Sequence, residues 1–594
     1  MDIQTCRHSL SHVLAAAVQQ LMPGAKLGIG PATDEGFYYD FLLPEGCSFT
    51  PETLKQIEKA MRKLLGGGAP FVRKDLPVAD ARRHFEAQGE TFKVELIDDL
   101  EKDGSREVGL YELGAFADLC AGPHVASAAE LRSVAFALDR VAGAYWRGSE
   151  KNPMLQRIYA LAFATKEELA DYRRRREEAM ARDHRRLGVE MELFATSPLV
   201  GKGLPLLLPK GATLRRILER FIVDEELARG YQHVYTPDLG RKKMYEISGH
   251  WDHYQTHMYP AIAVDGEDYV LRPMTCPHHF MIYAHKPRSY RDLPVRLAEL
   301  ATQYRKEDSG SLTGLIRVMS FHLSDSHILC APEQLRDEFL AVVDLVGHVM
   351  RQLGVRDSIG FRASLRDENS EKYVDNPELW DHAEKTLIEI LDQLGVPYET
   401  ARGEAAFYGP KLDVQMRNVL GKEDTVITIQ IDFALPERFE LTYVDHRGAE
   451  QRPVAIHRAS IGCIERTMAF LIEHYAGAFP SWLAPVQARL LTITDDQIPF
   501  AREALAAARK CGIRCELDER NEKIGRKMRD ARLQRIPYLL VIGAREAEQR
   551  CLTVRNRDTG AQQSLPLDAF LSNLCRETAE RSLVLSAEAP SAAS

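Results

Sequence analysis

The stretch that decides the fold is residues 303–317, which read QYRKEDSGSLTGLIR. Side chains alternate along a strand, so Arg305 and Glu307 point to one face of the strand predicted here. A loop rich in Gly and Ser follows, and Arg317 returns on the next predicted strand. The pattern predicts two strands joined by a loop, which together present two guanidinium groups and one carboxylate to a common cleft. Guanidinium groups match phosphate oxygens, and a carboxylate can accept from an exocyclic amine.

Three further segments contain residues that suit a metal ion. Cys276, His327 and His457 lie in RPMTCPHH (272–279), FHLSDSH (321–327) and HRASIGCIER (457–466). One thiolate and two imidazoles suit zinc, and three protein ligands leave a fourth coordination position open. An open position indicates a metal that holds a substrate rather than one that holds a fold. Spacing alone leaves core or surface roles open for all three residues.

Composition excludes several classes of protein. The chain has 594 residues, of which 45% are hydrophobic and 27% charged, as in soluble globular proteins of several domains. Ten scattered cysteines fit a reducing compartment, and neither a signal peptide nor a long apolar run is evident. We therefore expect a cytoplasmic protein without a membrane segment. A net charge of -9 argues against indiscriminate nucleic-acid binding but allows local basic faces.

Changes in pattern along the chain predict a multidomain α+β protein. Leu10 to Leu21 is typical of an amphipathic helix that ends at Pro23-Gly24, and residues 164–187 of an arginine-rich linking helix. That helix is either simply solvated or a contact for RNA phosphates. From Arg489 onward, strands and helices alternate as in an α/β domain. The expected segments are 1–163, the linker 164–187, the central domain 188–480, the α/β domain 481–585 and a disordered tail 586–594.

Two more clusters lie outside the central domain. His8 and His12 are one helical turn apart, and Cys120 and His124 flank a Gly-Pro turn, so all four are candidate metal ligands or a purely structural cluster. Residues 520–535 hold seven basic and two acidic residues. On an acidic protein this run indicates a local RNA-binding surface, although a solvated basic helix has the same pattern.

Taken together, the motifs resemble those of class II aminoacyl-tRNA synthetases. The Tyr-Arg-x-Glu segment with its returning arginine is similar to motif 2, residues 462–466 to motif 3, and residues 235–237 to motif 1 at the dimer interface. Further matches extend over nearly the whole chain and resemble bacterial threonyl-tRNA synthetases: MTCP (274–277), GHW (249–251), FYGPK (407–411) and WLAPVQ (482–487). The resemblance implies an antiparallel catalytic sheet with helices, an N-terminal editing domain and a C-terminal anticodon-binding domain.

The resemblance also implies a reaction and its residues. L-Threonine would be activated by ATP with Mg²⁺, then transferred to tRNA(Thr) by a homodimer that carries one Zn²⁺ per subunit on Cys276, His327 and His457. The zinc would bind the amino group and hydroxyl of threonine, with Asp325, Tyr408, Gln430 and Met274 around the substrate. Arg305 would contact the α-phosphate, Arg317 and Arg466 the distal phosphates, and Glu307 the adenine amine. Lys411 lines the same cleft, and His250 matches a histidine thought to help deprotonate the terminal ribose hydroxyl.

For the other domains the resemblance implies roles in accuracy and tRNA recognition. One methyl group separates serine from threonine and is worth only about 1–3 kcal/mol, so a second, hydrolytic site is needed. Seven residues match that editing pocket, in which the threonyl family works without a metal: His8, His12, Tyr39, Lys93, Asp118, Cys120 and His124. Four residues match positions that read or support anticodon bases: Asn521, Arg529, Glu546 and Arg555.

The sequence departs from the family at several positions near the pocket. Leu323, Ser324, Thr275 and Cys463 replace residues that are usual there. Because His8 is only eight residues from the start, we also expect that the usual N-terminal ubiquitin-like domain is missing. These departures leave open a paralogous ligase with a different substrate preference or inhibitor response. A third reading is an RNA-binding regulator that has lost catalysis, and the intact arginines and metal ligands argue against it.

Overall fold

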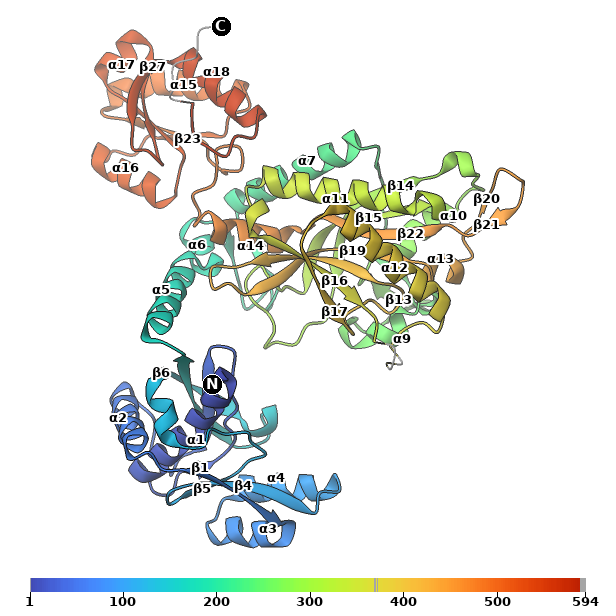
Figure 1. The fold of residues 1–594 in the computed structure, drawn as a ribbon. Helices are drawn as coiled ribbons and strands as arrows, with labels where there is room; N and C mark the ends of the chain where they lie inside the picture. The colour runs from blue at the N-terminus through green and yellow to red at the C-terminus, as the bar shows by residue number, and fades with distance from the viewer. Residues whose placement is uncertain (1, 368–369, 371, 588–594) are drawn as a thin grey trace. The chain divides into compact units, whose positions relative to one another are not determined.

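The computed structural model describes residues 2–367, 370 and 372–587, which form two compact units, Met1–Glu177 and Glu178–Ser594. In the first unit (blue to cyan in Figure 1), helix α1 (Ile3–Leu21) packs against α2 (Pro51–Gly67) and strand β2 (Gly36–Leu42). The helix begins earlier than predicted because the Asp2 carboxylate caps it, accepting from the backbone N–H groups of Gln4 and Thr5. Both His8 and His12 therefore lie on one regular helix.

Two sheets complete the first unit. Four strands are ordered β1 (Lys26–Leu27), β2, β7 (Met154–Phe163) and β6 (Ala135–Tyr145). A smaller sheet contains β3 (Phe71–Pro77), β4 (Glu107–Leu113) and β5 (Phe116–Leu119), beside helices α3 (Val78–Ala87) and α4 (Thr91–Lys102). Cys120 follows β5 directly, so the turn that contains Cys120 and His124 lies next to α1.

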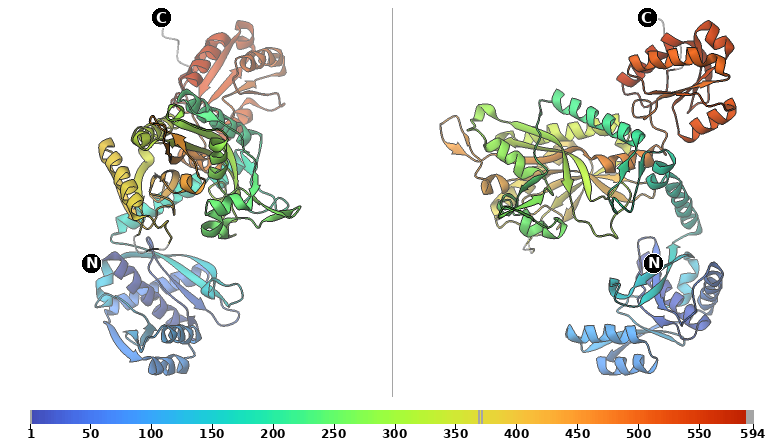
Figure 2. Two further views of the ribbon diagram at one scale, coloured as in Figure 1. Left: turned by 90° about the vertical axis from the view of Figure 1, so that its right-hand side faces the viewer. Right: turned by 180° about the vertical axis from the view of Figure 1, so that it is seen from behind.

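The second unit is organised around a mixed, mainly antiparallel sheet of eight strands (Figures 1 and 2). Helices α11 (Leu335–Gln352) and α14 (Ile464–His474) pack against its central strands, and α7 (Pro209–Ala228) packs on α14. A continuous apolar core lies between these helices and the sheet. In spatial order the strands are β10 (Gln232–His233), β14 (Val295–Tyr304), β15 (Ser320–Cys330), β22 (Val454–Cys463), β19 (Glu423–Asp432), β18 (Lys411–Arg417), β16 (Ile359–Leu365) and β17 (Tyr398–Arg402).

The two strands predicted around residues 303–317 are shorter than expected. Strand β14 ends at Tyr304 and β15 begins at Ser320, so Arg305, Glu307 and Arg317 lie on the connection between them. The backbone leaves the sheet because the N–H of Lys306 donates to the carbonyl of His257, 2.8 Å away, instead of to the neighbouring strand. The prediction that these three residues sit on strands was wrong.

The arginine-rich linker is also broken. It consists of α5 (Lys166–Arg182) and α6 (His184–Glu190), since Asp183 has a non-helical backbone and caps α6 through the N–H of Arg185. Six of its seven arginines are engaged in ion pairs with acidic side chains, which favours the solvated-helix interpretation over a dedicated phosphate contact. The pairs are Arg174–Asp171, Arg175–Asp171, Arg176–Asp139, Arg182–Glu178, Arg185–Asp183 and Arg186–Glu190.

The C-terminal part of the second unit (red in Figure 1) is a five-stranded sheet with its own core. The order is β24 (Cys515–Asp518), β23 (Ala488–Thr492), β25 (Tyr538–Ile542), β26 (Cys551–Asn556) and β27 (Gln562–Pro566), with helices α15 (Ile498–Lys510), α16 (Ile524–Leu533), α17 (Ala544–Gln549) and α18 (Leu567–Ala579).

The predicted disordered tail, 586–594, lies outside the described residues from 588 onward. Its first two residues contradict the prediction. Ala587 is buried, and the backbone N–H of Ser586 donates to Glu577 over 2.7 Å. Within the described part of the chain, no helix combines the length and apolar character needed to cross a membrane.

Candidate functional site

A cavity of about 660 Å³ lies over the eight-stranded sheet and collects most of the site residues predicted in the central domain. Strand register explains why. His327 pairs with His457, His457 with Gln430, and Gln430 with Lys411, so these side chains form one row across β15, β22, β19 and β18. Residues directly opposite one another on neighbouring strands point to the same face. The predicted residues that line the cavity are Met274, Cys276, Arg305, Glu307, Arg317, Asp325, Tyr408, Lys411, Gln430, His457 and Arg466.

The three predicted metal ligands converge in the buried floor of this site. The ligand atoms of Cys276, His327 and His457 all lie within 4.8 Å of one another. Among the described residues, His327 Nε2 and His457 Nδ1 are buried without a hydrogen-bond partner. A buried nitrogen without a partner is costly, and a cation that accepts both lone pairs would relieve that cost. The donor set and its orphaned nitrogens therefore fit a zinc ion.

Hydrogen bonds behind the ligands determine which ring nitrogens face the site. His457 Nε2 lies 2.7 Å from Asp432 Oδ2. Because a carboxylate accepts, the Nε2–H donates and the Nδ1 lone pair faces the site. His327 Nδ1 lies 2.8 Å from His279 Nδ1, and His279 Nε2 lies 3.3 Å from Glu299 Oε2. A neutral His279 that donates to Glu299 must accept from His327, which leaves His327 Nε2 for the metal.

Glu299 is held in its charged form. Burial alone would raise the pKa of its carboxyl group, but hydrogen bonds from His279 and Thr236 and the charge of Arg272 lower this pKa to about 2. Arg272 Nη1 lies 3.1 Å from the carboxylate, and both side chains are almost fully buried. Burial lowers the pKa of His327 well below its usual range and raises that of the Cys276 thiol well above it. A bound dication would supply the charge that stabilises the thiolate.

The arginines and Glu307 all line the cavity, and two of them, Arg317 and Arg466, contact the turn of residues 313–317. Arg317 pairs with Glu307 over 2.7 Å and remains half exposed. Arg466 donates from Nε to the carbonyl of Ile316 over 3.1 Å and from Nη1 to the carbonyl of Thr425 over 2.9 Å. The Arg305 guanidinium lies 5.1 Å from the ring centre of Phe321, and its buried Nε has no partner among the described residues. Of the three arginines, Arg305 is the best placed to take a new anion.

Around the metal ligands, polar side chains are already paired with one another. Gln303 donates to Asp325 Oδ2 over 3.0 Å, and Tyr408 donates to Gln430. Lys411 Nζ lies 2.7 Å from Asp413, a buried carboxylate. Burial raises the pKa of Asp325 and raises that of Tyr408 well above its usual range. These pairs fix the orientation of the groups that would surround a small polar substrate.

Two of the residues predicted for the central domain do not line the cavity. His327 is fully buried beneath it, as a metal ligand in the floor would be. His250 is also fully buried, with Nδ1 2.7 Å from Ser248 Oγ and its ring centre 5.6 Å from that of Phe407. Burial lowers the pKa of His250 to about 3, so the ring is neutral at physiological pH.

The structure adds functional residues that sequence reasoning missed. Gln303 lies two residues before Arg305 and contacts Asp325, so strand alternation was an available signal for it. His279 is part of the quoted RPMTCPHH segment, but its contact with His327 depends on packing. Asp432 and Glu299 carry no motif signal, since only sheet register brings them behind the ligands.

The departures from the family pattern are not equivalent. Leu323 and Cys463 face each other in register and both line the cavity. Ser324 is buried on the other side of the strand, where its hydroxyl accepts from the backbone N–H groups of Ser460 and Ile461. Only the first two can contact a bound molecule directly.

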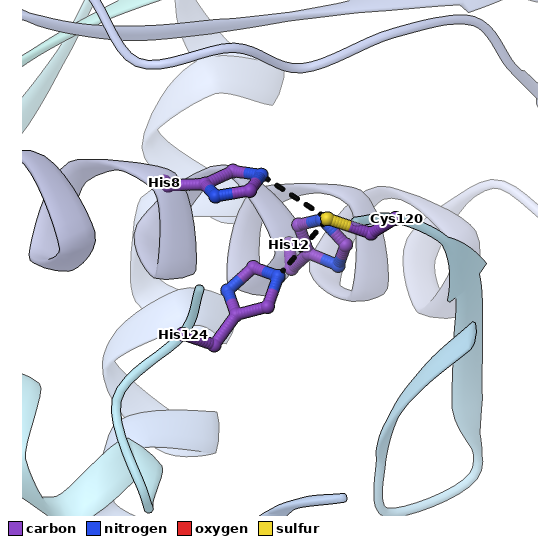
Figure 3. Close-up of side chains that lie close together, drawn as sticks. All are labelled: His8, His12, Cys120 and His124. Atoms are coloured by element: carbon purple, nitrogen blue, oxygen red, sulfur yellow. Dashed lines mark hydrogen bonds between the residues drawn. The ribbon is translucent and has the colours of Figure 1, made fainter. Parts of the chain in front are cut away.

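A second cluster lies in the first unit, between α1 and the turn after β5 (Figure 3). Cys120 Sγ is 3.3 Å from both His8 Nε2 and His124 Nε2, and one ligand atom from each of His8, His12, Cys120 and His124 lies within 4.8 Å of the others. The outer nitrogens are engaged, His8 Nδ1 with the carbonyl of Pro123 and His124 Nδ1 with Ser9 Oγ. Burial lowers the pKa of His8 and lowers that of His124 to about 2.

A buried ion pair between Lys93 and Asp118 lies beside this cluster. Lys93 Nζ lies 2.6 Å from Asp118 Oδ1 and 3.1 Å from the Tyr39 hydroxyl, which itself donates to Asp118. His12 Nε2 lies 3.9 Å from Asp118 Oδ2 and joins the two groups. Burial and the neighbouring carboxylate raise the pKa of Tyr39 well above its usual range. The structure thus brings all seven residues predicted for the N-terminal site into one neighbourhood.

The predicted anticodon residues lie in the C-terminal part of the second unit. Asn521 and Arg529 are exposed, and Arg529 lines a surface hollow with Arg532 and Arg535. Glu546 instead caps α17, accepting from the Gly543 N–H over 2.9 Å. Lys527, part of the basic run, is buried and donates to the carbonyls of Thr492 and Asp518, so it has a structural role.

Comparison with known proteins identifies the family. The model for the "tRNA synthetase class II core domain (G, H, P, S and T)" matches residues 259–475, that for the "Anticodon binding domain" residues 484–577, and that for the "Threonyl and Alanyl tRNA synthetase second additional domain" residues 108–159. Each match falls on one of the three regions described above.

Relatives extend the match over nearly the whole chain. Threonine–tRNA ligase of Anoxybacillus flavithermus is 50% identical over 573 residues, 96% of this chain and 88% of that relative. Threonine–tRNA ligase 1 of Bacillus subtilis is 48% identical over 97% of this chain and 89% of its own. The solved RNA binding domain of threonyl-tRNA synthetase from Cryptosporidium parvum is 35% identical with a TM-score of 0.64, covering 68% of this chain and 99% of that one. The chain belongs to the threonine–tRNA ligase family of class II aminoacyl-tRNA synthetases.

Proposed function

We propose that this threonine–tRNA ligase uses a zinc ion on Cys276, His327 and His457 to recognise the threonine hydroxyl. The observation that carries the proposal is the pair of buried nitrogens, His327 Nε2 and His457 Nδ1, whose other ring nitrogens are engaged by His279 and Asp432. Valine is nearly isosteric with threonine, and an apolar pocket separates such a pair only about 10²-fold. Valine has no hydroxyl group, so a metal that requires an oxygen ligand would be left with incomplete coordination when valine binds. Asp325, Met274, Tyr408 and Gln430 surround the same space.

Activation would follow on the neighbouring part of the cavity. The threonine carboxylate attacks the α-phosphate of ATP, which gives threonyl-adenylate and releases pyrophosphate, and Mg²⁺ accompanies the nucleotide. Arg305 contacts the α-phosphate, Arg317 and Arg466 hold the distal phosphates, Glu307 accepts from the adenine amine, and Lys411 lines the cleft. Arg317 must leave Glu307 when ATP enters, since the two now form an ion pair. His250 assists transfer to tRNA(Thr).

The experiment that tests this function measures threonine-dependent ATP–pyrophosphate exchange and then charging of tRNA(Thr). We expect both activities, with threonine as the preferred amino acid. Absence of exchange, or a different amino acid that outcompetes threonine, would contradict the proposal. The second outcome would favour a paralogue whose preference is altered by Leu323 and Cys463, the two cavity-lining departures.

The carboxylate that accepts from His457, behind the zinc site, gives a separate prediction. We expect Asp432→Asn to lower zinc affinity about 10–100-fold, because the carboxylate that orients His457 loses its charge. Competition with a chelator of known affinity measures this change. Glu338→Gln is the matched control, since Glu338 is a buried carboxylate paired with Arg296 that does not line the cavity. Equal zinc affinity in both variants would refute the orienting role of Asp432.

In the first unit we propose hydrolytic editing of Ser-tRNA(Thr) at His8, His12, Tyr39, Lys93, Asp118, Cys120 and His124. Support comes from the convergence of these residues and from the family match to residues 108–159, which include three of them. The neutral state of His8 and His124 suits them to accept hydrogen bonds from a water or from the terminal adenosine.

Editing is tested by the identity of the amino acid on tRNA(Thr). We expect His8→Ala or Cys120→Ala to accumulate Ser-tRNA(Thr) while threonine activation is unchanged, because these residues lie in a separate unit from the cavity. His84→Ala, a change on α3 in the same unit, serves as the control and should remain accurate. Unchanged accuracy in His8→Ala and Cys120→Ala would exclude this site from editing.

Two further assignments complete the proposal. Asn521, Arg529, Glu546 and Arg555 read or support the anticodon, supported by the family match to residues 484–577 and by the exposed arginines of α16. The ligase acts as a homodimer, supported by large apolar side chains left exposed near the motif 1 segment. Tyr235 is 93% exposed, and Leu239, Ile262 and Val264 are also exposed.

A further inference from the structure

We propose that His184 is a positioning residue for ATP binding, which fixes the turn that carries Arg317 through a hydrogen-bond chain from Glu473 to the backbone of Leu315. The inference rests on the proposed role of Arg317 toward the phosphates of ATP. His184 is the first residue of α6, immediately after the break in the linker, and it lies outside the sequence motifs quoted above.

The chain of hydrogen bonds has a defined direction. His184 Nδ1 lies 2.6 Å from Glu473 Oε1, and the ring is almost fully buried. A carboxylate accepts, so Nδ1 carries the hydrogen and Nε2 presents its lone pair. The backbone N–H of Leu315 donates to that Nε2 over 3.2 Å. Leu315 is itself fully buried, so this N–H would be left without a partner if the imidazole were removed.

The bonded residue sits at the centre of the turn. Thr313 and Arg317 exchange backbone hydrogen bonds of 3.1 and 3.2 Å, which closes the turn two residues on either side of Leu315. Gly314 has a φ of +49°, and a Cβ atom at this position would lie 2.1 Å from His184 Nε2. The glycine therefore permits both the left-handed backbone and the close approach of the imidazole.

Helix α14 holds this turn at two neighbouring residues, Leu315 and Ile316. Arg466 and Glu473 are seven residues apart on the helix, so their side chains lie on one face. Arg466 donates directly to the carbonyl of Ile316, while Glu473 acts on the N–H of Leu315 through His184. The backbone next to Arg317 is thereby fixed, while its side chain stays half exposed and able to exchange Glu307 for a phosphate.

A cation site is the alternative use of this cluster, because Asp183, His184 and Glu473 offer ligand atoms within 4.8 Å of one another. Both imidazole nitrogens are already engaged, by Glu473 and by Leu315. Asp183 is engaged too, with the N–H and the guanidinium of Arg185. The hydrogen-bond chain uses both His184 nitrogens and Glu473, and Arg185 occupies Asp183, so the contacts support the chain rather than a cation site.

The test is pyrophosphate exchange with His184→Phe, which keeps a flat ring but removes both nitrogens. We expect the KM for ATP to rise about tenfold or more, because the buried N–H of Leu315 loses its acceptor and the turn loosens. The KM for threonine should stay within about twofold, since the metal site is untouched. His184→Gln, whose amide oxygen can accept from Leu315, should recover most of the ATP affinity. Equal changes in both KM values, or no change in either, would overturn the proposal.

Hydrogen exchange shows whether the effect of the substitution is confined to the turn that carries Arg317. We expect faster amide exchange in residues 311–319 of His184→Phe, with other core segments unchanged. His348→Phe is the matched control. His348 Nε2 lies 3.1 Å from Glu225 Oε2, and His348 does not line the cavity. Should His184→Phe fail to fold, Glu473→Leu and Glu473→Gln test the same chain of hydrogen bonds. We expect Glu473→Leu to lose ATP affinity and Glu473→Gln to retain it. Similar ATP KM values in these two variants would overturn the proposal.

Failure of this inference is distinguishable from failure of the proposed function. If Arg317→Ala leaves the KM for ATP unchanged, the role of Arg317 itself is wrong. If Arg317→Ala raises that KM and His184→Phe does not, the role of Arg317 stands and the positioning role of His184 is wrong.

Discussion

Arg305→Ala is expected to lower kcat/KM for threonine-dependent pyrophosphate exchange about 10³-fold, because a fixed cation at the α-phosphate is lost. The guanidinium lines the cavity, rests on Phe321 and Tyr254, and has a buried Nε without a partner among the described residues. It is therefore already oriented and lacks a competing carboxylate at that atom. Arg305→Lys should be intermediate, since it keeps the charge and loses the planar fork.

The control for this variant is Arg356→Ala. Arg356 also rests on an aromatic ring, with its guanidinium 5.8 Å from the centre of Phe361, but it does not line the cavity. We expect normal exchange in this control and normal zinc content in both proteins. An Arg305→Ala enzyme with nearly unchanged kcat/KM would show that activation does not depend on this cation.

Cys276→Ala is expected to lose the zinc ion and to lower threonine activation about 10⁴-fold, the penalty for a site that can no longer bind the substrate hydroxyl. Cys276 begins helix α10 (Cys276–Ala284) and supplies the only thiol among the three converging ligands. Zinc content by atomic spectroscopy and pyrophosphate exchange are measured on the same preparation. Both should fall together.

Cys330→Ala provides the matched control for that experiment. Cys330 is a fully buried thiol at the end of β15, the strand that carries His327, and it lies in the apolar core rather than in the cavity. This variant should keep its zinc and its exchange activity. If Cys276→Ala also kept its zinc and its exchange activity, the metal would have to be held elsewhere. The proposed recognition of the threonine hydroxyl at this metal site would then be wrong.

Much of the site could be predicted because it follows from strand alternation. His327 and Asp325 are two residues apart on β15, so they share a face, and flanking motifs marked both. The same rule failed for Arg305 and Arg317, since the backbone leaves the sheet to bond His257, a partner far away in the sequence. Alternation of side chains predicts which face a residue points to only while the backbone stays paired with a neighbouring strand.

The residues behind the site could not be predicted from the sequence. Asp432 reaches His457 only because β19 pairs with β22 in one register, and a shift of one residue would turn it away. His184 and Leu315 are separated by 131 positions and meet through the packing of α6 on α14. Such contacts depend on tertiary structure and leave no local pattern.

The central claim is that the metal site selects a hydroxyl group, and one measurement tests it most directly. Pyrophosphate exchange is compared for threonine, serine and valine with the zinc-loaded enzyme. We expect serine to be activated within about 10–200-fold of threonine, and valine about 10⁴-fold less efficiently than threonine. Valine activation within about 10²-fold of threonine is what a simple apolar pocket would give, and that result would contradict the account.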